Sequence, residues 1–452
     1  MIQQQGMRID PRMFISGPFI ECPRCGKPEF GVLMIGGNGY TRRCRECWFD
    51  QRFPLPALKK RIIYLDQFLI SNITKALDSE SKGHARVLKQ PFWLDAFKKL
   101  DRLLKLHLIA CPDSLAHRDE SLMSGDPPFE LLNHVYEHLS HGTTFWDHDT
   151  IIRFQMYHCF TAYLDGGTPK LMEADEVVHG RLHEWHDRLR ISMRSFTGQD
   201  EIDRMRASRD RGYEELAGVF ETWGSQQRDR SFQDRMRDEA EAFGRGIGES
   251  YGAYLGRWQR LNQEFAAGMT PDSDAAFLDA ALPPPAFLIV RSMREELEKR
   301  GITGEASFTK VGEYLRSPDL LLEVPYVHIS TMLFAAIARK AASGQLRPPS
   351  KGTFTDVRTI ASLLPYCDAM FLDAEMAGFV GEEPLRTETV KYKTQVFSVN
   401  TKEEFLAYLN GVEEEAGADH AQVVRQVYGD DWLAPYLSLV EDHKRRHDEN
   451  AR

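Results

Sequence analysis

Four cysteines near the start of the chain form two close pairs, Cys22-Pro-Arg-Cys25 and Cys44-Arg-Glu-Cys47. Four thiolates arranged as a tetrahedron are a common zinc site. Between the pairs, the sequence predicts two short strands joined by the glycine-rich turn at residues 36–39. The spacing therefore predicts a zinc ribbon over residues 13–53, in which the ion supplies the folding energy that so small a unit lacks. Buried cysteines without a ligand are the alternative.

Three aspartates stand where a parallel α/β sheet places its chemistry. Asp66 ends the apolar run 61–65 and Asp373 ends the run 369–372, and both runs are typical of buried strands. Asp356 falls in the first turn of a predicted helix. Because ligands of open α/β sheets bind outside the carboxyl ends of the strands, we expect the three side chains to share one crevice. Asp66 and Asp356 could instead cap a helix, a position that favours Asp.

Glu120 is the fourth acid of the predicted site. It lies in a helix that Ser114 can cap, after a second apolar run over residues 105–111. Asp119 or Asp113 could take its place. Several carboxylates in one crevice repel by about 4 kcal/mol per pair at 4 Å and an effective dielectric near 20, so they need a cation. Mg²⁺ and Mn²⁺ prefer such oxygen ligands and can promote hydrolysis of a phosphodiester.

Three segments around these acids resemble PIN-like nuclease domains. Residues 62–72, Ile-Ile-Tyr-Leu-Asp-Gln-Phe-Leu-Ile-Ser-Asn, resemble the opening strand that delivers the family's first catalytic Asp. Residues 111–120 are similar to the second motif, which contributes a Glu from a helix. Residues 354–373 resemble the later half, where one Asp opens a helix and a strand brings the last Asp to the crevice. The resemblance implies a nuclease, most often acting on RNA, with Mg²⁺ or Mn²⁺ held by the catalytic residues Asp66, Glu120, Asp356 and Asp373.

The implied fold is α/β, a PIN-like parallel sheet flanked by helices with an N-terminal zinc ribbon and a large helical insertion. We expect the two halves of the PIN-like domain at residues 60–125 and 345–412, the insertion at 126–344 and a charged helical tail at 413–452. The boundaries of individual elements follow from apolar periodicity. Predicted helices cover residues 67–77, 92–104, 174–195, 200–224, 230–265, 331–342, 355–364 and 403–409, a last strand covers 394–399, and Pro283, Pro284 and Pro285 mark a boundary within the insertion.

The charge of the chain restricts how it could contact nucleic acid. A net charge of −10 over 452 residues argues against indiscriminate coating, which depends on many Lys and Arg side chains. The best local cluster lies in and after the ribbon, where basic residues stand among the aromatics Tyr40, Trp48 and Phe49 and could attract phosphate and stack bases. Simple solubilisation of the ribbon is the alternative. The basic residues are Arg24, Lys27, Arg42, Arg43, Arg45, Lys59, Lys60 and Arg61.

Other features have simpler interpretations. The remaining cysteines are expected to be small core residues, and two histidine sets at helical spacing are expected at or near the surface. No apolar run has the length of a membrane span and no leader is recognisable, so we expect no membrane contact and a cytoplasmic protein. The cysteines are Cys111, Cys159 and Cys367, and the histidine sets are His134, His138 and His141, and His179, His183 and His186.

The leading hypothesis from the sequence is a metal-dependent endoribonuclease acting on single-stranded RNA. The ribbon would present the substrate, and the insertion would gate it or dock a protein partner. The alternative is a non-catalytic module that binds RNA or protein through a degenerate PIN-like fold and the ribbon. A third reading is another phosphohydrolase with an acid cluster, acting on DNA or a small phosphoester.

Overall fold

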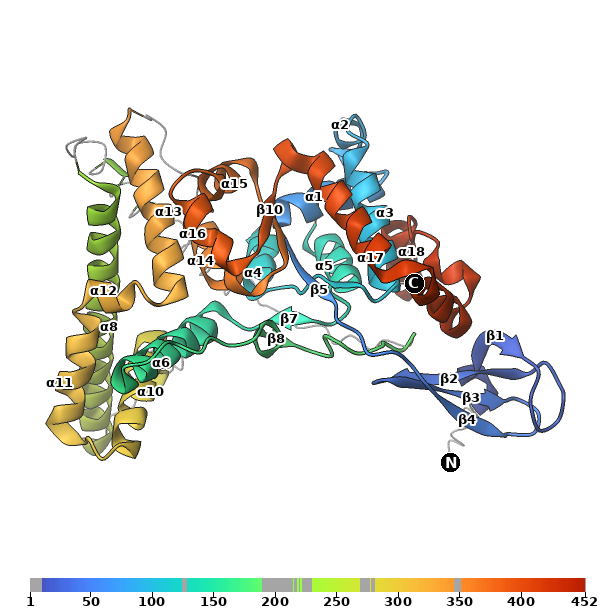
Figure 1. Cartoon of the computed structure of the whole chain (residues 1–452), viewed down its shortest axis with the longest axis horizontal. Helices are drawn as coiled ribbons and strands as arrows, with labels where there is room; N and C mark the ends of the chain where they lie inside the picture. The colour runs from blue at the N-terminus through green and yellow to red at the C-terminus, as the bar shows by residue number, and fades with distance from the viewer. Residues whose placement is uncertain are drawn as a thin grey trace.

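The computed structural model describes residues 10–123, 128–188, 230–268, 281–344 and 352–451, together with positions 214, 218, 220, 221, 277 and 350. It is a mixed α/β molecule in which a small β unit lies at one end, a parallel sheet with its helices at the centre and a bundle of helices at the other end (Figure 1). No helix in these ranges combines the length and apolar character that crossing a bilayer requires.

The N-terminal unit is one antiparallel sheet in chain order. Its strands are β1 (Ser16–Ile20), β2 (Phe30–Gly36), β3 (Gly39–Cys44) and β4 (Asp50–Pro54). The two strands expected between the cysteine pairs are β2 and β3, and Gly37, with φ of 57°, turns the chain between them. A residue with a side chain would be strained in that conformation.

The interior of this unit is too small to fold the segment by itself. Cys22, Phe30 and Cys44 are its buried cluster. Its other face docks on the rest of the molecule, and buried Arg42 donates to the carbonyl oxygen of Gln426 at 2.8 Å. The docking cluster consists of Val32, Ile35, Leu55, Leu106, Trp185, Val424, Val427, Tyr428 and Leu433.

The central sheet has four parallel strands in the order β10 (Gln395–Phe397), β9 (Ala369–Phe371), β5 (Arg61–Leu65) and β6 (Ile109–Ala110). The apolar runs that predicted these strands are therefore present as strands. Strand β6 is shorter than its run because α3 ends at Lys105 and residues 106–108 form a turn, in which His107 has a φ of 59°.

Strand β5 is buried on both faces, which explains why its sequence lacks polar alternation. Ile62 and Tyr64 point into one hydrophobic cluster, and Ile63 and Leu65 point into another on the opposite face. The strand is thus the shared wall of two cores.

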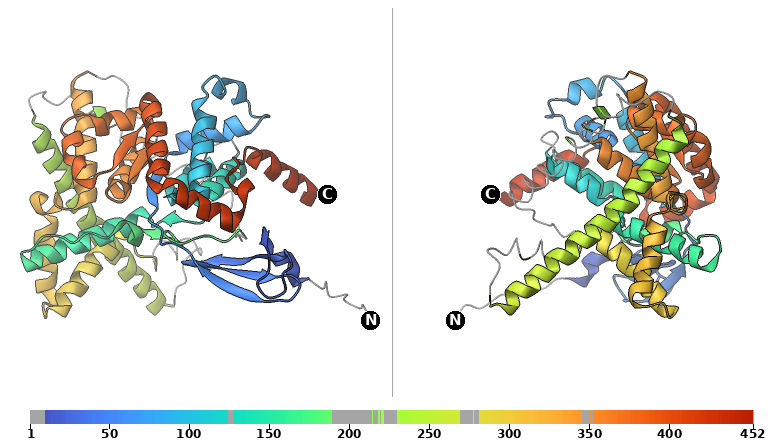
Figure 2. Two further views of the ribbon diagram at one scale, coloured as in Figure 1. Left: turned by 45° about the vertical axis from the view of Figure 1, so that its right-hand side comes forward. Right: turned by 90° about the vertical axis from the view of Figure 1, so that its left-hand side faces the viewer.

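Helices cover both faces of the sheet. The core beside Ile63 and Leu65 receives side chains from α1 (Gln67–Leu77), α3 (Phe92–Lys105), α5 (Phe129–Ser140), α17 (Lys402–Tyr428) and α18 (Leu439–Ala451). The core beside Ile62 and Tyr64 receives side chains from α6 (His148–Asp165), α8 (Phe232–Ala266), α10 (Pro285–Lys299), α11 (Gly304–Leu315), α12 (Pro318–Leu321), α13 (Pro325–Ala342), α14 (Thr353–Leu363), α15 (Ala374–Gly381) and α16 (Leu385–Thr389). Residues expected as an insertion therefore contribute to both cores. The right-hand view of Figure 2 shows α8 as a long rod along the helical part.

The remaining elements are short. They are η1 (Pro11–Phe14), α2 (His84–Val87), α4 (Leu115–Met123), β7 (Thr144–Phe145), η2 (Ala174–Val177), β8 (Val178–His179), η3 (Leu364–Tyr366), η4 (Val390–Tyr392), η5 (Val399–Thr401) and η6 (Asp430–Leu433).

The helix predicted over residues 174–195 is wrong where the structure describes it. The segment forms η2 and then β8, which pairs with β7, and continues without helix through residue 188. Trp185 explains the outcome, because its fully buried ring packs between the ribbon and α17 and its Nε1 donates to the Pro56 carbonyl at 2.8 Å. The helix expected over residues 230–265 is α8, and most of the segment 200–224 lies outside the described residues.

Candidate metal centres

The four cysteines of the ribbon converge as their spacing predicted. Cys22 Sγ lies 3.6 Å from Cys47 Sγ, and Cys25 Sγ lies 3.7 Å from Cys44 Sγ. All four sulfurs lie within 4.8 Å of one another. A tetrahedral Zn²⁺ with bonds of about 2.3 Å would hold its sulfurs about 3.8 Å apart. The cluster could therefore bind zinc without rearrangement.

Each cysteine pair lies on a tight turn that aims two thiols at one point. Gly26 N donates to the Cys22 carbonyl at 2.8 Å, and Trp48 N donates to the Cys44 carbonyl at 3.1 Å. Desolvation opposes ionisation of Cys22, but hydrogen bonds from the backbone of Cys25 and Arg24 outweigh it and lower the pKa of this thiol to about 7. A hydrogen bond from the Lys27 backbone lowers the pKa of Cys25 on the same turn, but desolvation and hydrogen bonds shared with the other cysteines outweigh it, and this pKa moves the other way, to about 12. Cys22 is thus the thiol more ready to ionise, and a metal ion would compete with the proton on Cys25.

Asp66 and Asp373 follow neighbouring strands at the same edge of the sheet. Leu65 pairs with Phe371 in the β5–β9 ladder, so the two acids leave the sheet side by side. Asp66 Oδ1 accepts from Phe68 N at 2.7 Å at the start of α1, and Asp373 Oδ1 accepts from Glu375 N at 2.7 Å at the start of α15. Both acids therefore cap helices, the alternative that the sequence left open for Asp66. A carboxylate has about four lone-pair positions, so a capping carboxylate can still bind an ion.

Asp356 completes the cluster from the first turn of α14. One carboxylate oxygen from each of Asp66, Asp356 and Asp373 lies within 4.8 Å of the other two, and all three side chains are half-buried. We call these three residues the acid triad. Oxygen donors without sulfur or nitrogen are the set that Mg²⁺ and Mn²⁺ prefer, so the triad could hold either ion.

The electrostatics of the triad favour a cation. Loss of hydration raises the pKa of Asp66 to about 6, and the charge of Asp373 adds to this effect. Loss of hydration also raises the pKa of Asp356 to about 9, with further contributions from the charges of Asp66 and Glu120. Without a counter-charge the cluster retains protons near neutral pH, and a divalent ion would compete with those protons.

Glu120 lies near the triad without joining its tightest group. It is half-buried on α4, and its charge contributes to the raised pKa of Asp356. The alternatives for this position differ in placement. Asp119 is exposed on the same helix, whereas half-buried Asp113 is near enough for its charge to raise the pKa of Tyr136. These positions favour Glu120 over Asp119 as the fourth acid.

Asp368 belongs to the opposite edge of the sheet. Its Oδ2 accepts from Ile62 N at 2.8 Å, and its Oδ1 accepts from Arg61 at 3.2 Å. These bonds join the amino ends of β5 and β9. Asp368 is therefore a structural residue, although it stands only a short strand away from Asp373.

The three other cysteines are buried core residues, as expected. Among the residues that the structure describes, the groups with metal-binding geometry are the four cysteines and the acid triad. Neither histidine set is one of them. In the first set, His138 Nε2 lies 2.8 Å from Asp101 Oδ1, and the His134 ring stacks on His443 with centroids 4.2 Å apart.

A stack of three rings beneath the triad was not predicted. The His117 ring lies between Tyr64 and Tyr136, with centroids 4.9 Å and 4.7 Å away. The Tyr136 hydroxyl is buried without a hydrogen-bond partner among the described residues. Burial raises the pKa of this hydroxyl, and the negative charges of Asp66 and Glu120 raise it further. Two features of the sequence could have indicated this stack. Tyr64 stands two residues before Asp66, and His117 stands about one helical turn before Glu120.

The basic cluster of the ribbon is largely engaged within the molecule. Arg42 and Lys60 are buried, and Arg45 donates to the Ile15 carbonyl. Ion pairs join Lys27 to Glu46, Arg43 to Asp50, and Arg61 to both Asp368 and Glu415. Of the aromatic rings, Tyr40 packs on Phe53 and Phe49 packs on Phe30, whereas Trp48 is 40% exposed. Of the expected basic cluster, Arg24 and Lys59 are exposed and make no ion pair within the residues that the structure describes.

No protein-family model matches the chain, and neither the curated proteins nor the solved structures contain a match. The class defined by the fold and its sites is thus a mixed α/β protein with a parallel sheet, a zinc-ribbon-like cysteine cluster and a separate acidic cluster.

Proposed function

We propose that the chain is a metal-dependent nuclease of the PIN-like type that hydrolyses phosphodiester bonds in single-stranded RNA. The observation that carries the proposal is the meeting of Asp66, Asp356 and Asp373, which are distant in the sequence, within 4.8 Å at the carboxyl edge of a parallel sheet. That is the order and placement of acids that the resemblance to PIN-like domains implies.

The residues present suit the chemistry. Asp66, Asp356 and Asp373 would hold Mg²⁺ or Mn²⁺, with Glu120 as the fourth acid at the side of the site. A bound ion of this kind lowers the charge on a phosphate, activates water and stabilises the leaving oxygen. The caps on Asp66 and Asp373 fix the two side chains against helix starts, so the ligand oxygens are positioned before the substrate arrives.

The choice of substrate rests on the resemblance and on the ribbon. PIN-like domains act most often on RNA. Near the ribbon, Arg24 and Lys59 are exposed cations and Trp48 offers a partly exposed ring, which are the elements of single-strand binding. The helical part would limit access to the site or dock a partner.

The direct test is cleavage of a labelled single-stranded RNA in Mn²⁺ or Mg²⁺ by the wild type, Asp66→Asn and Asp373→Asn. We expect each variant to lose about 10²-fold or more of the rate, the magnitude of one preorganised electrostatic group. Asp368→Asn is the matched control, because it changes an aspartate at the other end of the same strands and should keep its activity.

Two outcomes would contradict the proposal. One is full activity in both triad variants. The other is a folded wild type that cleaves no nucleic acid but binds RNA with the same affinity after triad substitution, which would establish the non-catalytic binding module instead.

A further inference from the structure

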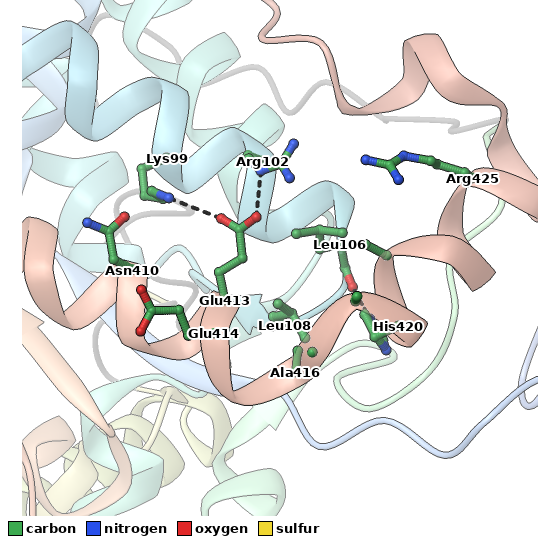
Figure 3. Close-up of a pocket in the computed structure, with 13 residues that line it drawn as sticks. Lys99, Arg102, Leu106, Leu108, Asn410, Glu413, Glu414, Ala416, His420 and Arg425 are labelled. Carbon is green, nitrogen blue, oxygen red and sulfur yellow. Dashed lines mark hydrogen bonds and ion pairs between the residues drawn. The ribbon is translucent and has the colours of Figure 1, made fainter.

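A cavity of about 560 Å³ lies between α3 and α17 (Figure 3). Leu106 and Leu108, in its wall, come just before β6, and β6 begins where Ile109 pairs with Arg61, the first residue of β5. The acid triad follows the other, carboxyl end of β5. The cavity therefore lies at the opposite edge of the sheet from the proposed metal centre, and what it binds does not depend on the nuclease proposal.

A break in α17 shapes this cavity. Gly417 has φ of 74° and ψ of 171° inside the helix Lys402–Tyr428. Essentially only glycine adopts that conformation, and a Cβ there would meet nothing within 4 Å. The backbone conformation, not crowding, thus calls for glycine. Ala416, Gly417 and Ala418, which form the break, all line the cavity.

Three cations from two helices line the cavity. Glu413 accepts from Lys99 Nζ at 3.0 Å and from Arg102 Nε at 2.8 Å, so one carboxylate serves both cations. Arg425 is exposed and makes no ion pair with the residues that the structure describes. In Figure 3 the guanidinium groups of Arg102 and Arg425 point toward each other across the cavity. Facing like charges are unfavourable unless an anion lies between them.

The local charge contrasts with that of the whole chain. Lys99, Arg102 and Arg425 stand against Glu413 and Glu414, so the lining is net cationic although the chain carries −10. A guanidinium binds phosphate through two parallel hydrogen bonds, which makes paired arginines well suited to a phosphate group.

The rest of the lining fits an organic body attached to that anion. Leu106, Leu108, Ala416 and Ala421 provide an apolar wall, and Asn410 provides both a donor and an acceptor. The volume falls in the range of small-molecule sites, about 300–1,000 Å³, and exceeds what inorganic phosphate needs. A planar base attached to a sugar phosphate satisfies all three features.

We propose that this cavity binds a nucleotide, with the phosphate between Arg102 and Arg425 and the base against the leucine wall. The same chemistry is present in a free nucleoside monophosphate and in the phosphorylated end of a strand. Glu413 competes with the phosphate, because it already occupies Lys99 and Arg102.

The test is calorimetric titration of the full chain with AMP, GMP, CMP and UMP in buffer without added Mg²⁺ or Mn²⁺. Adenosine and inorganic phosphate test the two halves of the ligand, and a 5′-phosphorylated oligonucleotide against its unphosphorylated form tests a strand end. We expect saturable binding of at least one monophosphate, at least 10-fold weaker binding of phosphate and none of adenosine.

Two variants that should change the nucleotide affinity in opposite directions make the test specific. Arg425→Ala should weaken nucleotide binding by roughly 10-fold or more, the loss of a charge-assisted hydrogen bond. Glu413→Gln should strengthen it several-fold, because it releases Lys99 and Arg102, whereas a merely structural role would not predict tighter binding. Arg316→Ala, at an exposed arginine beyond the end of α11, is the matched control and should change nothing.

Three results would overturn the nucleotide site. They are no saturable binding of any monophosphate or phosphorylated oligonucleotide, equal affinity for phosphate and nucleotide, and an affinity that Arg425→Ala leaves unchanged. Tighter binding of the phosphorylated oligonucleotide than of any monophosphate, lost in Arg425→Ala, would support the site and identify a strand end as the source.

Discussion

The ribbon and the acid triad are both candidate metal centres, but they are built in opposite ways. The ribbon takes four thiols from residues 22–47, on two turns of one small sheet. The triad takes its carboxylates from three elements that the chain reaches far apart, at positions 66, 356 and 373. In the first, the ion would hold the unit together. In the second, the fold assembles the ligands and an ion would relieve their repulsion.

This difference separates the roles that a metal can have. A closed tetrahedron of sulfurs leaves no position for a substrate, whereas carboxylates on a rigid sheet edge leave coordination sites open. The ribbon has only a small cysteine-lined interior and would depend on a bound ion, whereas the two hydrophobic cores around β5 are built from apolar side chains outside the triad. Removing the two ions should therefore have different consequences.

The largest expected effect is on the ribbon. Cys44→Ser should remove the bound zinc and unfold residues 16–54, because structural zinc contributes an apparent binding free energy of about 10–16 kcal/mol to such units. The sheet β10-β9-β5-β6 should stay folded. Hydrogen exchange, together with the zinc content, measures both. Cys159→Ser, at a buried thiol of the core, is the control and should retain zinc. Global unfolding of Cys44→Ser would break the proposed independence of the two regions.

The next effect is on the pH dependence of stability. The pKa of Asp66 is raised to about 6 and that of Asp356 to about 9, against 3.8 as the ordinary value. Between these pH values the folded chain therefore holds protons that the unfolded chain releases, so the free energy of unfolding falls as the pH rises. The stabilisation is fully present below about pH 4 and is lost as the pH rises to about 9. Urea unfolding without Mg²⁺ or Mn²⁺ should show the decline, and Asp356→Asn should flatten it.

Added Mn²⁺ should restore stability most at high pH, because the ion competes with protons for the same oxygens. If the free energy of unfolding falls with pH as steeply in Asp356→Asn as in the wild type, the carboxylates of the triad do not interact as their distances indicate.

A smaller effect would identify the fourth acid. Glu120→Gln should lower the rate of RNA cleavage by about 10-fold, since it removes a charge beside the triad without breaking its tightest group. Asp119→Asn, one residue earlier and exposed, should stay within about 2-fold of wild type. The reverse order of effects in the cleavage assay would reassign the position.

The smallest effect concerns the ring stack. Tyr136→Phe removes a buried hydroxyl that has no partner among the described residues and lies near the triad. If that hydroxyl orients a water or carboxylate of the site, kcat should fall by about 2- to 10-fold, the magnitude of one hydrogen bond, while the affinity for Mn²⁺ stays the same. Tyr314→Phe removes another buried hydroxyl that has no partner in the described part of the chain, and it should have no effect. Equal effects would show that the loss is one of packing.

Local signals predicted much of the fold. The run before Asp66 is strand β5, the amphipathic segment after residue 92 is α3, and Pro285 opens α10. Periodicity failed where a long-range contact decides the conformation. Trp185 is held by the ribbon and α17, so its segment is extended although its composition favoured a helix. Gly417 breaks α17. The sequence predicted a short helix at residues 403–409 and a helical tail from residue 413, but it did not predict one long helix with a break at Gly417.

The sequence by itself determined the cysteine cluster, because two short turns place four sulfurs through local backbone geometry alone. It also placed three aspartates at the ends of the elements that carry them. Only the tertiary structure decided that those aspartates meet, that Asp368 does not join them, and that most ribbon cations are engaged internally. The physical reason is that burial, repulsion and pairing depend on distances between segments, and these are set by how the strands order in the sheet and how the helices pack on it.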